Sequence, residues 1–149
     1  MLPEGSKAPN FTLTSHTDVL VSLSDFAGSN VLVYFYPKDD TPGCTKEACT
    51  ITELYDEFQK AGILVLGVSK DNPESHRAFR EKYHFPFTLL SDPDQEVISL
   101  YGAKGLLGTK RISYLISPDG TILKAYPNVN PATHAYEILK DVKSLAISL

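Results

Sequence analysis

The sequence has 149 residues, a length that suits one domain with a sizeable hydrophobic core. Hydrophobic residues make up 42% and charged residues 21% of the chain, which is ordinary for a soluble globular protein. The net charge of −4 argues against nucleic acid or an anionic membrane as a partner. No run of about 18 apolar residues predicts a membrane-spanning helix. Residues 1–7 lack the apolar stretch of a secretory signal, so we expect a cytoplasmic protein.

The first half of the chain is typical of a hairpin followed by alternating strands and helices. Short alternating runs at 10–14 and 19–23, separated by a turn, predict a β-hairpin at a sheet edge. Residues 24–30 are turn-like. The continuously apolar run 31–36 then predicts a strand buried on both faces. A helix is expected over residues 42–60, because apolar residues recur there at helical spacing.

The second half continues this alternation and ends with a hairpin and a helix. Proline next to aspartate or asparagine marks two of the helix starts, and Ser117-Pro118-Asp119-Gly120 is a favoured tight-turn sequence. The expected helices cover 71–83, 91–101 and 131–145, and the expected strands cover 63–68, 87–90, 111–116 and 121–126. This order implies one α/β domain over residues 1–149, with a mixed central sheet flanked by helices.

Both cysteines of the chain follow the 31–36 strand closely. Thr41 is expected to cap the next helix with its hydroxyl, and Pro42 suits the first helical position. Cys44 is then the third helical residue, where free backbone N–H groups and the positive end of the helix dipole stabilise a thiolate. A thiolate is a nucleophile. The alternative for a free cysteine is a small buried hydrophobic residue.

The spacing between Cys44 and Cys49 can be compared with helix geometry. Five residues along a regular helix separate the two Cα atoms by about 8.6 Å, whereas a disulfide tolerates at most about 7 Å. A bond between the two cysteines would therefore require the start of the helix to unwind. We interpret the pair as a redox switch between a helical dithiol and a locally unfolded disulfide.

The pattern Pro37-xxx-Thr41-xx-Cys44 resembles the active-site signature of peroxiredoxins. The spacing to Cys49 is similar to that of their peroxiredoxin Q, or bacterioferritin comigratory protein, subfamily. The resemblance extends over nearly the whole chain and implies a thioredoxin-like fold of the peroxiredoxin type with an N-terminal β-hairpin. It also implies a thiol-dependent peroxidase that reduces hydrogen peroxide and organic hydroperoxides. The expected protein is a monomer or weak homodimer that is recycled by a dithiol such as thioredoxin, with no metal, haem or flavin.

The resemblance assigns roles to individual residues. Cys44 would attack the peroxide and become a sulfenic acid, and Cys49 would condense with it to a disulfide. The Thr41 hydroxyl would orient the peroxide and the thiolate, and Pro37 would shield the pocket from water. Arg111, which opens a late strand, would stabilise thiolate and peroxide with fixed N–H groups.

These residues also have plainer interpretations. Thr41 could be only a helix cap, Pro37 only a strand terminator, and Arg111 a solvated surface cation. Glu47 could hold Arg111 in place by a bidentate pair, or it could be an ordinary acid in the first helical turn. Cys49 could be an inert helix residue, with the reductant attacking the sulfenic acid directly.

Two other functions remain open at this point. A disulfide oxidoreductase acting on proteins would normally use a Cys-x-x-Cys pair, in which a disulfide fits without unwinding. A non-enzymatic redox sensor or holdase would use the same switch to expose apolar surface to a partner. A metal site is disfavoured, because the four histidines lie in different expected elements without ligand spacing: His16, His76, His84 and His134.

Overall fold

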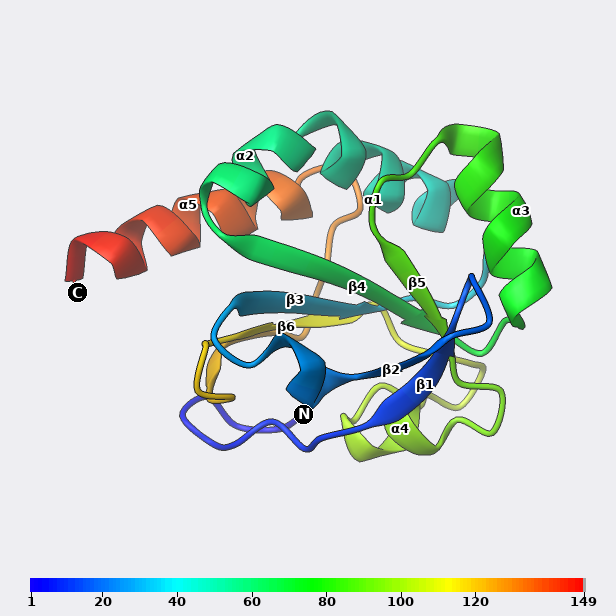
Figure 1. The fold of residues 1–149 in the computed structure, drawn as a ribbon, viewed down its shortest axis with the longest axis horizontal. Helices are drawn as coiled ribbons and strands as arrows, with labels where there is room; N and C mark the ends of the chain where they lie inside the picture. Colours follow the sequence, from blue (N-terminus) through cyan, green and yellow to red (C-terminus); the bar gives the residue numbers. More distant parts are fainter. Residues whose placement is uncertain (149) are drawn as a thin grey trace.

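A computed structural model describes residues 1–148, and in this part of the chain the strands form one mixed sheet (Figure 1). The strands are β1 (Thr12–Ser15), β2 (Leu20–Ser22), β3 (Asn30–Phe35), β4 (Ile63–Ser69), β5 (Thr88–Ser91), β6 (Ile112–Ile116) and β7 (Ile122–Tyr126). Their order is β2-β1-β5-β4-β3-β6-β7, with β3, β4 and β5 parallel to one another and the other pairings antiparallel. The mixed sheet and the N-terminal hairpin expected from the sequence are confirmed.

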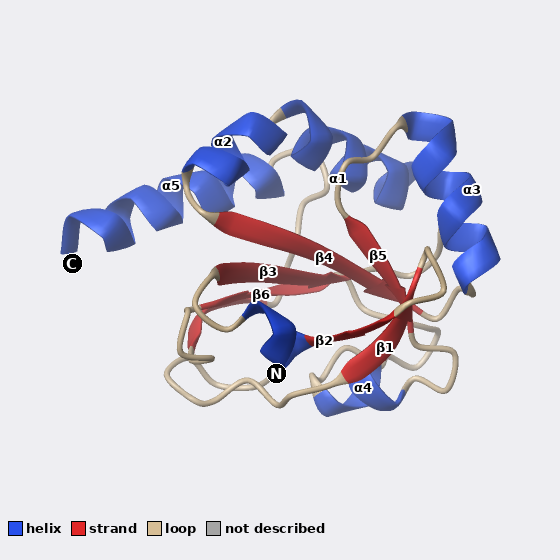
Figure 2. Cartoon of the chain, viewed as in Figure 1, coloured by secondary structure: helices blue, strands red, loops and turns tan. Residues whose placement is uncertain are grey.

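Helices cover both faces of this sheet. They are α1 (Pro42–Glu53), α2 (Tyr55–Lys60), α3 (Pro73–Tyr83), α4 (Glu96–Leu100) and α5 (His134–Ser148), with a 3-10 helix η1 at Leu23–Phe26. Figure 2 shows α1, α2, α3 and α5 on one side of the strands and α4 on the other. Within residues 1–148, no helix is long and apolar enough to cross a membrane.

The central strand β3 contributes to the hydrophobic core on both faces of the sheet. Leu32 and Tyr34 belong to a cluster that includes Ala48 of α1. Val33 and Phe35 belong to a second cluster on the opposite face. Because side chains alternate along a strand, one set packs on the face that carries α1, and the other set packs on the opposite face. The loop from β3 to α1 therefore begins at the carboxyl end of a strand that is packed on both faces.

The helix expected over residues 42–60 is interrupted at Leu54. This residue has φ −102° and ψ 12°, and it separates α1 from α2. The hydroxyls of Thr50 and Thr52 each donate to a main-chain carbonyl four residues earlier, at 2.8 Å. Threonine bonds of this kind compete with the helical ladder and bend helices. The expectation of one continuous helix was therefore wrong.

The helix expected over residues 91–101 begins only at Glu96. Asp92 explains the delay. Its carboxylate accepts the N–H of Ile98 at 2.8 Å, and its carbonyl accepts the N–H of Gln95 at 3.0 Å. These bonds form a turn, and Gln95 adopts a left-handed backbone with φ 58°. The residues that open this segment thus fold as a turn in front of a short helix.

Candidate active site

Both cysteines lie in α1, which begins beyond the carboxyl end of β3. Cys44 is the third residue of α1 and is 2% exposed. Cys49 lies further along the same helix and is half-buried. Both are free thiols in the described structure. The structure thus shows the helical dithiol, one of the two states that the spacing predicts.

Arg111 lies directly before β6, and its side chain contacts Cys44. Its Nη2 donates to the Cys44 Sγ at 3.3 Å, and its Nη1 donates to the Glu47 Oε1 at 2.8 Å. The register explains this approach, because Phe35 at the end of β3 pairs with Ile112 at the start of β6. The strand begins at Ile112, so Arg111 precedes it rather than opening it.

Glu47 holds Arg111 through a single carboxylate oxygen. The other oxygen, Oε2, is buried without a hydrogen-bond partner among residues 1–148, so the bidentate pair considered from the sequence is not formed. Desolvation by burial raises the pKa of Glu47 to about 7, although Arg111 acts in the opposite direction. Burial also opposes the charge on Arg111. Its hydrogen bonds to Cys44 and Glu47 outweigh this effect and raise the Arg111 pKa.

Glu47→Gln is expected to change how stability depends on pH. Burial raises the pKa of Glu47 from the ordinary 4.5 to about 7, so between these pH values the folded chain keeps a proton that the unfolded chain has lost. The stabilisation is complete below about pH 4.5 and is lost as the pH rises through about 7, a change on the order of 3 kcal/mol. Glutamine cannot ionise, so the variant should lack this slope in urea unfolding over the same pH series. Parallel pH profiles for wild type and variant would contradict the assignment.

The Thr41 hydroxyl does not cap α1, contrary to the expectation. Thr41 has the extended backbone of a cap residue, with φ −94° and ψ 157°, but its side chain accepts no helix N–H. Instead, its Oγ1 donates to the Lys38 carbonyl at 2.8 Å and closes a turn before the helix. The hydroxyl hydrogen is thereby committed, while the oxygen can still accept a hydrogen bond from a ligand.

Gly43 allows the close approach of Arg111, a role that the sequence analysis missed. A Cβ atom built at Gly43 would lie 2.8 Å from the Arg111 Nη2. Any larger residue here would therefore displace the guanidinium from the Cys44 sulfur. The glycine between Pro42 and Cys44 was the available signal, but its partner is distant in sequence.

Pro37 lies in the loop after β3 and is half-buried. It lines an open depression together with Ser99 and several residues of the segment 102–110. Leu106 and Leu107 of this segment are fully exposed. Shielding of the pocket by Pro37 stays a prediction.

Three of the four histidines are buried and make polar contacts. His76 pairs with Asp39, and His134 lies between Ser113 and Glu137. The His16 Nδ1 accepts the N–H of Leu89 at 3.4 Å. Within residues 1–148, no group of three or more His, Cys, Asp or Glu side chains is arranged to hold a metal ion.

Comparison with known sequences places nearly the whole chain among peroxiredoxin-like proteins. The AhpC/TSA family matches residues 5–125. A Coxiella burnetii protein with the description peroxiredoxin bcp is 44% identical over 143 residues, covering 91% of this chain and 95% of its own. The chloroplastic peroxiredoxin Q of Oryza sativa subsp. japonica is 46% identical over 146 residues, covering 95% of this chain and 67% of its own.

Solved structures show the same fold. A cysteine mutant of Xylella fastidiosa peroxiredoxin Q superposes with a TM-score of 0.92 at 31% identity, covering 98% of each chain. The bacterioferritin comigratory protein of Xanthomonas campestris, a structure concerned with alkyl peroxide reduction, superposes with a TM-score of 0.87 at 35% identity over 91% of this chain and 92% of its own. These matches confirm the expected thioredoxin-like fold of the peroxiredoxin type. The chain therefore belongs to the AhpC/TSA family, in its peroxiredoxin Q, or bacterioferritin comigratory protein, branch.

Proposed function

We propose that this chain is a thiol-dependent peroxidase in which the Cys44 thiolate reduces hydrogen peroxide or an organic hydroperoxide. The observation that carries the proposal is the contact of 3.3 Å between the Arg111 Nη2 and the buried Cys44 Sγ. A cation fixed beside a thiol favours the thiolate, which is the reactive form. The other guanidinium nitrogen, Nη1 of Arg111, donates to Glu47, which keeps the guanidinium in place. Membership of the peroxiredoxin family supports the same reaction.

In the first step, the Cys44 sulfur attacks one oxygen of the peroxide. The S–O bond forms as the O–O bond breaks, the sulfur is oxidised to a sulfenic acid, and the other oxygen takes up a proton and leaves as water or an alcohol. Negative charge spreads over both oxygens in the transition state, so the Arg111 guanidinium is well placed to stabilise it. We assign the Thr41 oxygen to accept a hydrogen bond from the peroxide, because its own hydrogen is bound to Lys38. We assign Pro37 to limit the access of water.

In the second step, Cys49 attacks the Cys44 sulfenic acid and gives an intramolecular disulfide and water. The start of α1 must unwind for this, because about 8.6 Å between the Cα atoms exceeds the limit of about 7 Å. Burial, and then the Glu53 carboxylate, raises the pKa of Cys49 in the intact helix. Unwinding would expose the thiol and remove the larger of these effects. Loss of helix and activation of Cys49 are thereby coupled.

An external dithiol such as thioredoxin then restores both thiols by exchange. Cys49 lines an open groove with Thr45, Lys46 and Tyr83, so a protein reductant could reach this side of α1. We propose that the enzyme acts as a monomer or weak homodimer in the cytoplasm, where such dithiols are kept reduced.

Cys49→Ser is expected to separate the two steps. With peroxide supplied at one equivalent, the variant should consume it at close to the wild-type rate and then stall, because serine cannot condense with the sulfenic acid. Peroxide consumption coupled to a thioredoxin system measures turnover, and mass spectrometry identifies the product. Wild type should lose two hydrogen atoms, and the variant should gain one oxygen atom.

Two results of this experiment would contradict the proposal. Continued turnover of Cys49→Ser with thioredoxin would show that the reductant attacks the Cys44 sulfenic acid directly. A wild-type protein that consumes no peroxide with any dithiol would overturn the peroxidase function and favour a protein disulfide oxidoreductase or a redox switch.

A further inference from the structure

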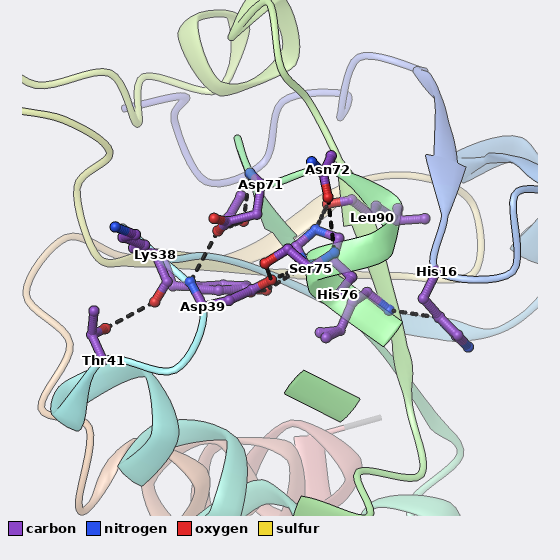
Figure 3. Close-up of polar contacts among 12 residues, drawn as sticks. His16, Lys38, Asp39, Thr41, Asp71, Asn72, Ser75, His76 and Leu90 are labelled. Carbon is purple, nitrogen blue, oxygen red and sulfur yellow. Dashed lines mark hydrogen bonds and ion pairs between the residues drawn. The ribbon is translucent and has the colours of Figure 1, made fainter. Parts of the chain in front are cut away.

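The loop that leads into α1 contains a buried aspartate that the proposed mechanism does not use. Asp39 lies two residues before Thr41, and its side chain is 4% exposed (Figure 3). Its Oδ1 accepts a hydrogen bond from the Tyr36 hydroxyl at 2.7 Å. Its Oδ2 accepts one from the Ser75 hydroxyl at 2.8 Å and lies 2.7 Å from the His76 Nδ1. The carboxylate is thus bound on both oxygens by side chains, of which those of Tyr36 and His76 are buried.

His76 is fully buried, and its Nδ1 lies within hydrogen-bond distance of the Asp39 carboxylate. Its Nε2 lies 2.9 Å from the main-chain carbonyl of Leu90, which can only accept a hydrogen bond. The Nε2 therefore donates to Leu90, and the Nδ1 on the other side of the ring faces the Asp39 carboxylate. Charge-assisted hydrogen bonds in a buried site are strong and directional. Asp39 contacts His76 of α3, and His76 contacts the main chain of Leu90 in β5, so Asp39 is linked to the central sheet (Figure 3).

The main chain of this loop is anchored as well. The Asp39 N–H donates to the Asp71 Oδ2 at 2.9 Å, and Asp71 in turn accepts from the Ser69 hydroxyl at the end of β4, at 2.7 Å. The neighbouring Lys38 carbonyl accepts the Thr41 hydroxyl, as Figure 3 shows. The turn before α1 is therefore fixed to two strands and one helix, and Asp39 is the residue that joins them.

We propose that Asp39, paired with His76, is a positioning residue that keeps the turn before α1 closed. A closed turn fixes the start of α1 and so holds Cys44 beside Arg111 for the first step. The same turn must open before Cys44 can bond to Cys49, because α1 has to unwind from its N-terminal end. The proposal rests on the proposed function. It gives the Asp39 anchor opposite effects on the two steps, because the anchor speeds oxidation and slows disulfide formation.

The anchor also affects the fate of the sulfenic acid. A sulfenic acid that waits for the helix to unwind is exposed to a second peroxide molecule, which oxidises it to sulfinic acid and ends the cycle. A tighter Asp39 anchor therefore gives a faster first step and a greater sensitivity to overoxidation.

The test compares Asp39→Asn with Asp40→Asn in the reduced full-length chain, with hydrogen peroxide as the probe. Asp40 is a matched control, because it also binds side chains of α3, the helix that contains His76, but is exposed. Its partners are Lys82 and Tyr83, each at 2.8 Å. Exposed pairs of this kind contribute little. Both substitutions replace a carboxylate with an amide of the same size. Asparagine also tolerates the left-handed backbone of Asp40, with φ 58°.

We expect Asp39→Asn to lower the second-order rate constant of Cys44 oxidation about tenfold, because a small misplacement of a reacting group has effects of this size. The rate of disulfide formation should rise about tenfold, and the overoxidised fraction at a fixed excess of peroxide should fall. Asp40→Asn should change neither rate by more than about twofold. Rapid mixing, chemical quenching and mass spectrometry follow the thiol, the sulfenic acid and the disulfide separately.

A purely structural role would not produce opposite changes in the two rates. Unchanged rates in Asp39→Asn, or a slowing of both steps, would overturn the positioning role. If Asp39→Asn does not fold, Ser75→Ala provides a milder test, because it removes only one donor to Asp39. It should slow Cys44 oxidation and speed disulfide formation, each by about threefold. No shift in Ser75→Ala would then overturn the proposal. A wild type that does not react with peroxide would overturn the proposed function and the positioning role with it.

Discussion

Cys44→Ser is expected to abolish peroxide reduction, including the first stoichiometric oxidation, with a loss of more than about 10³-fold in rate. In the proposed mechanism, the Cys44 sulfur takes the oxygen from the peroxide. A serine hydroxyl neither ionises at neutral pH nor forms a stable product of this kind. Serine is smaller than cysteine, so Arg111 and Glu47 should keep their positions. The loss of activity would therefore result from the missing sulfur rather than from a rearrangement of the site.

The measurement is peroxide consumed and thiol lost per mole of protein, without any reductant. Cys49→Ser serves as the control, because it removes the other thiol from the same helix and should still consume one equivalent. If Cys44→Ser consumed one equivalent and Cys49→Ser consumed none, the roles of the two cysteines would be reversed. Thermal unfolding of both variants establishes that the fold is intact.

The elements that the sequence predicts well are those whose local and tertiary preferences agree. The apolar run 31–36 becomes β3 because both faces of this strand pack into hydrophobic clusters. The hairpin of β6 and β7 follows its turn sequence, in which Gly120 adopts φ 86°. Local chemistry and packing select the same structure in both cases.

Helix capping shows where local signals become ambiguous. Asn72 and Thr41 both precede a proline that begins a helix. The Asn72 side chain does cap α3, accepting the N–H of Ser75 at 2.8 Å, whereas the Thr41 hydroxyl donates to Lys38 instead. A side-chain hydroxyl has several backbone partners within reach, and the shape of the preceding loop decides among them. That shape depends on Asp39 and its distant partners.

The candidate site divides in the same way. The positions of Cys44 and Cys49 follow from a single helix start, so they could be predicted from neighbouring residues. Arg111 was found only through the resemblance, because 67 residues separate it from Cys44. The pairing of Asp39 with His76, across 37 residues, has no signal in the spacing of either residue. Contacts of this kind arise when α3 and the β3–α1 loop meet at one edge of the sheet.

Arg111→Lys is expected to lower the second-order rate constant of Cys44 oxidation about 100-fold, although it preserves the positive charge. Arg111 uses two nitrogens at once, Nη2 on the Cys44 sulfur and Nη1 on the Glu47 carboxylate. Lysine presents a single compact ammonium in place of this planar fork and cannot reproduce the geometry of both contacts. Either the sulfur loses its donor, or the buried Glu47 loses its cation. Rapid-mixing oxidation by hydrogen peroxide, followed through the loss of free thiol, measures the effect.

A suitable control is Lys70→Met, because Lys70 is an exposed cation that directly follows β4 at the same edge of the sheet. This variant removes a positive charge from this edge of the sheet without touching the site, whereas Arg111→Lys keeps its charge. Lys70→Met should change the rate by less than about twofold. If Lys70→Met slowed oxidation as much as Arg111→Lys, the rate would also depend on the general positive potential of this edge, and a special role of the contacts made by Arg111 would not follow. If Arg111→Lys kept the wild-type rate, a single fixed cation would suffice, and the two-nitrogen geometry held by Glu47 would have no part in the first step.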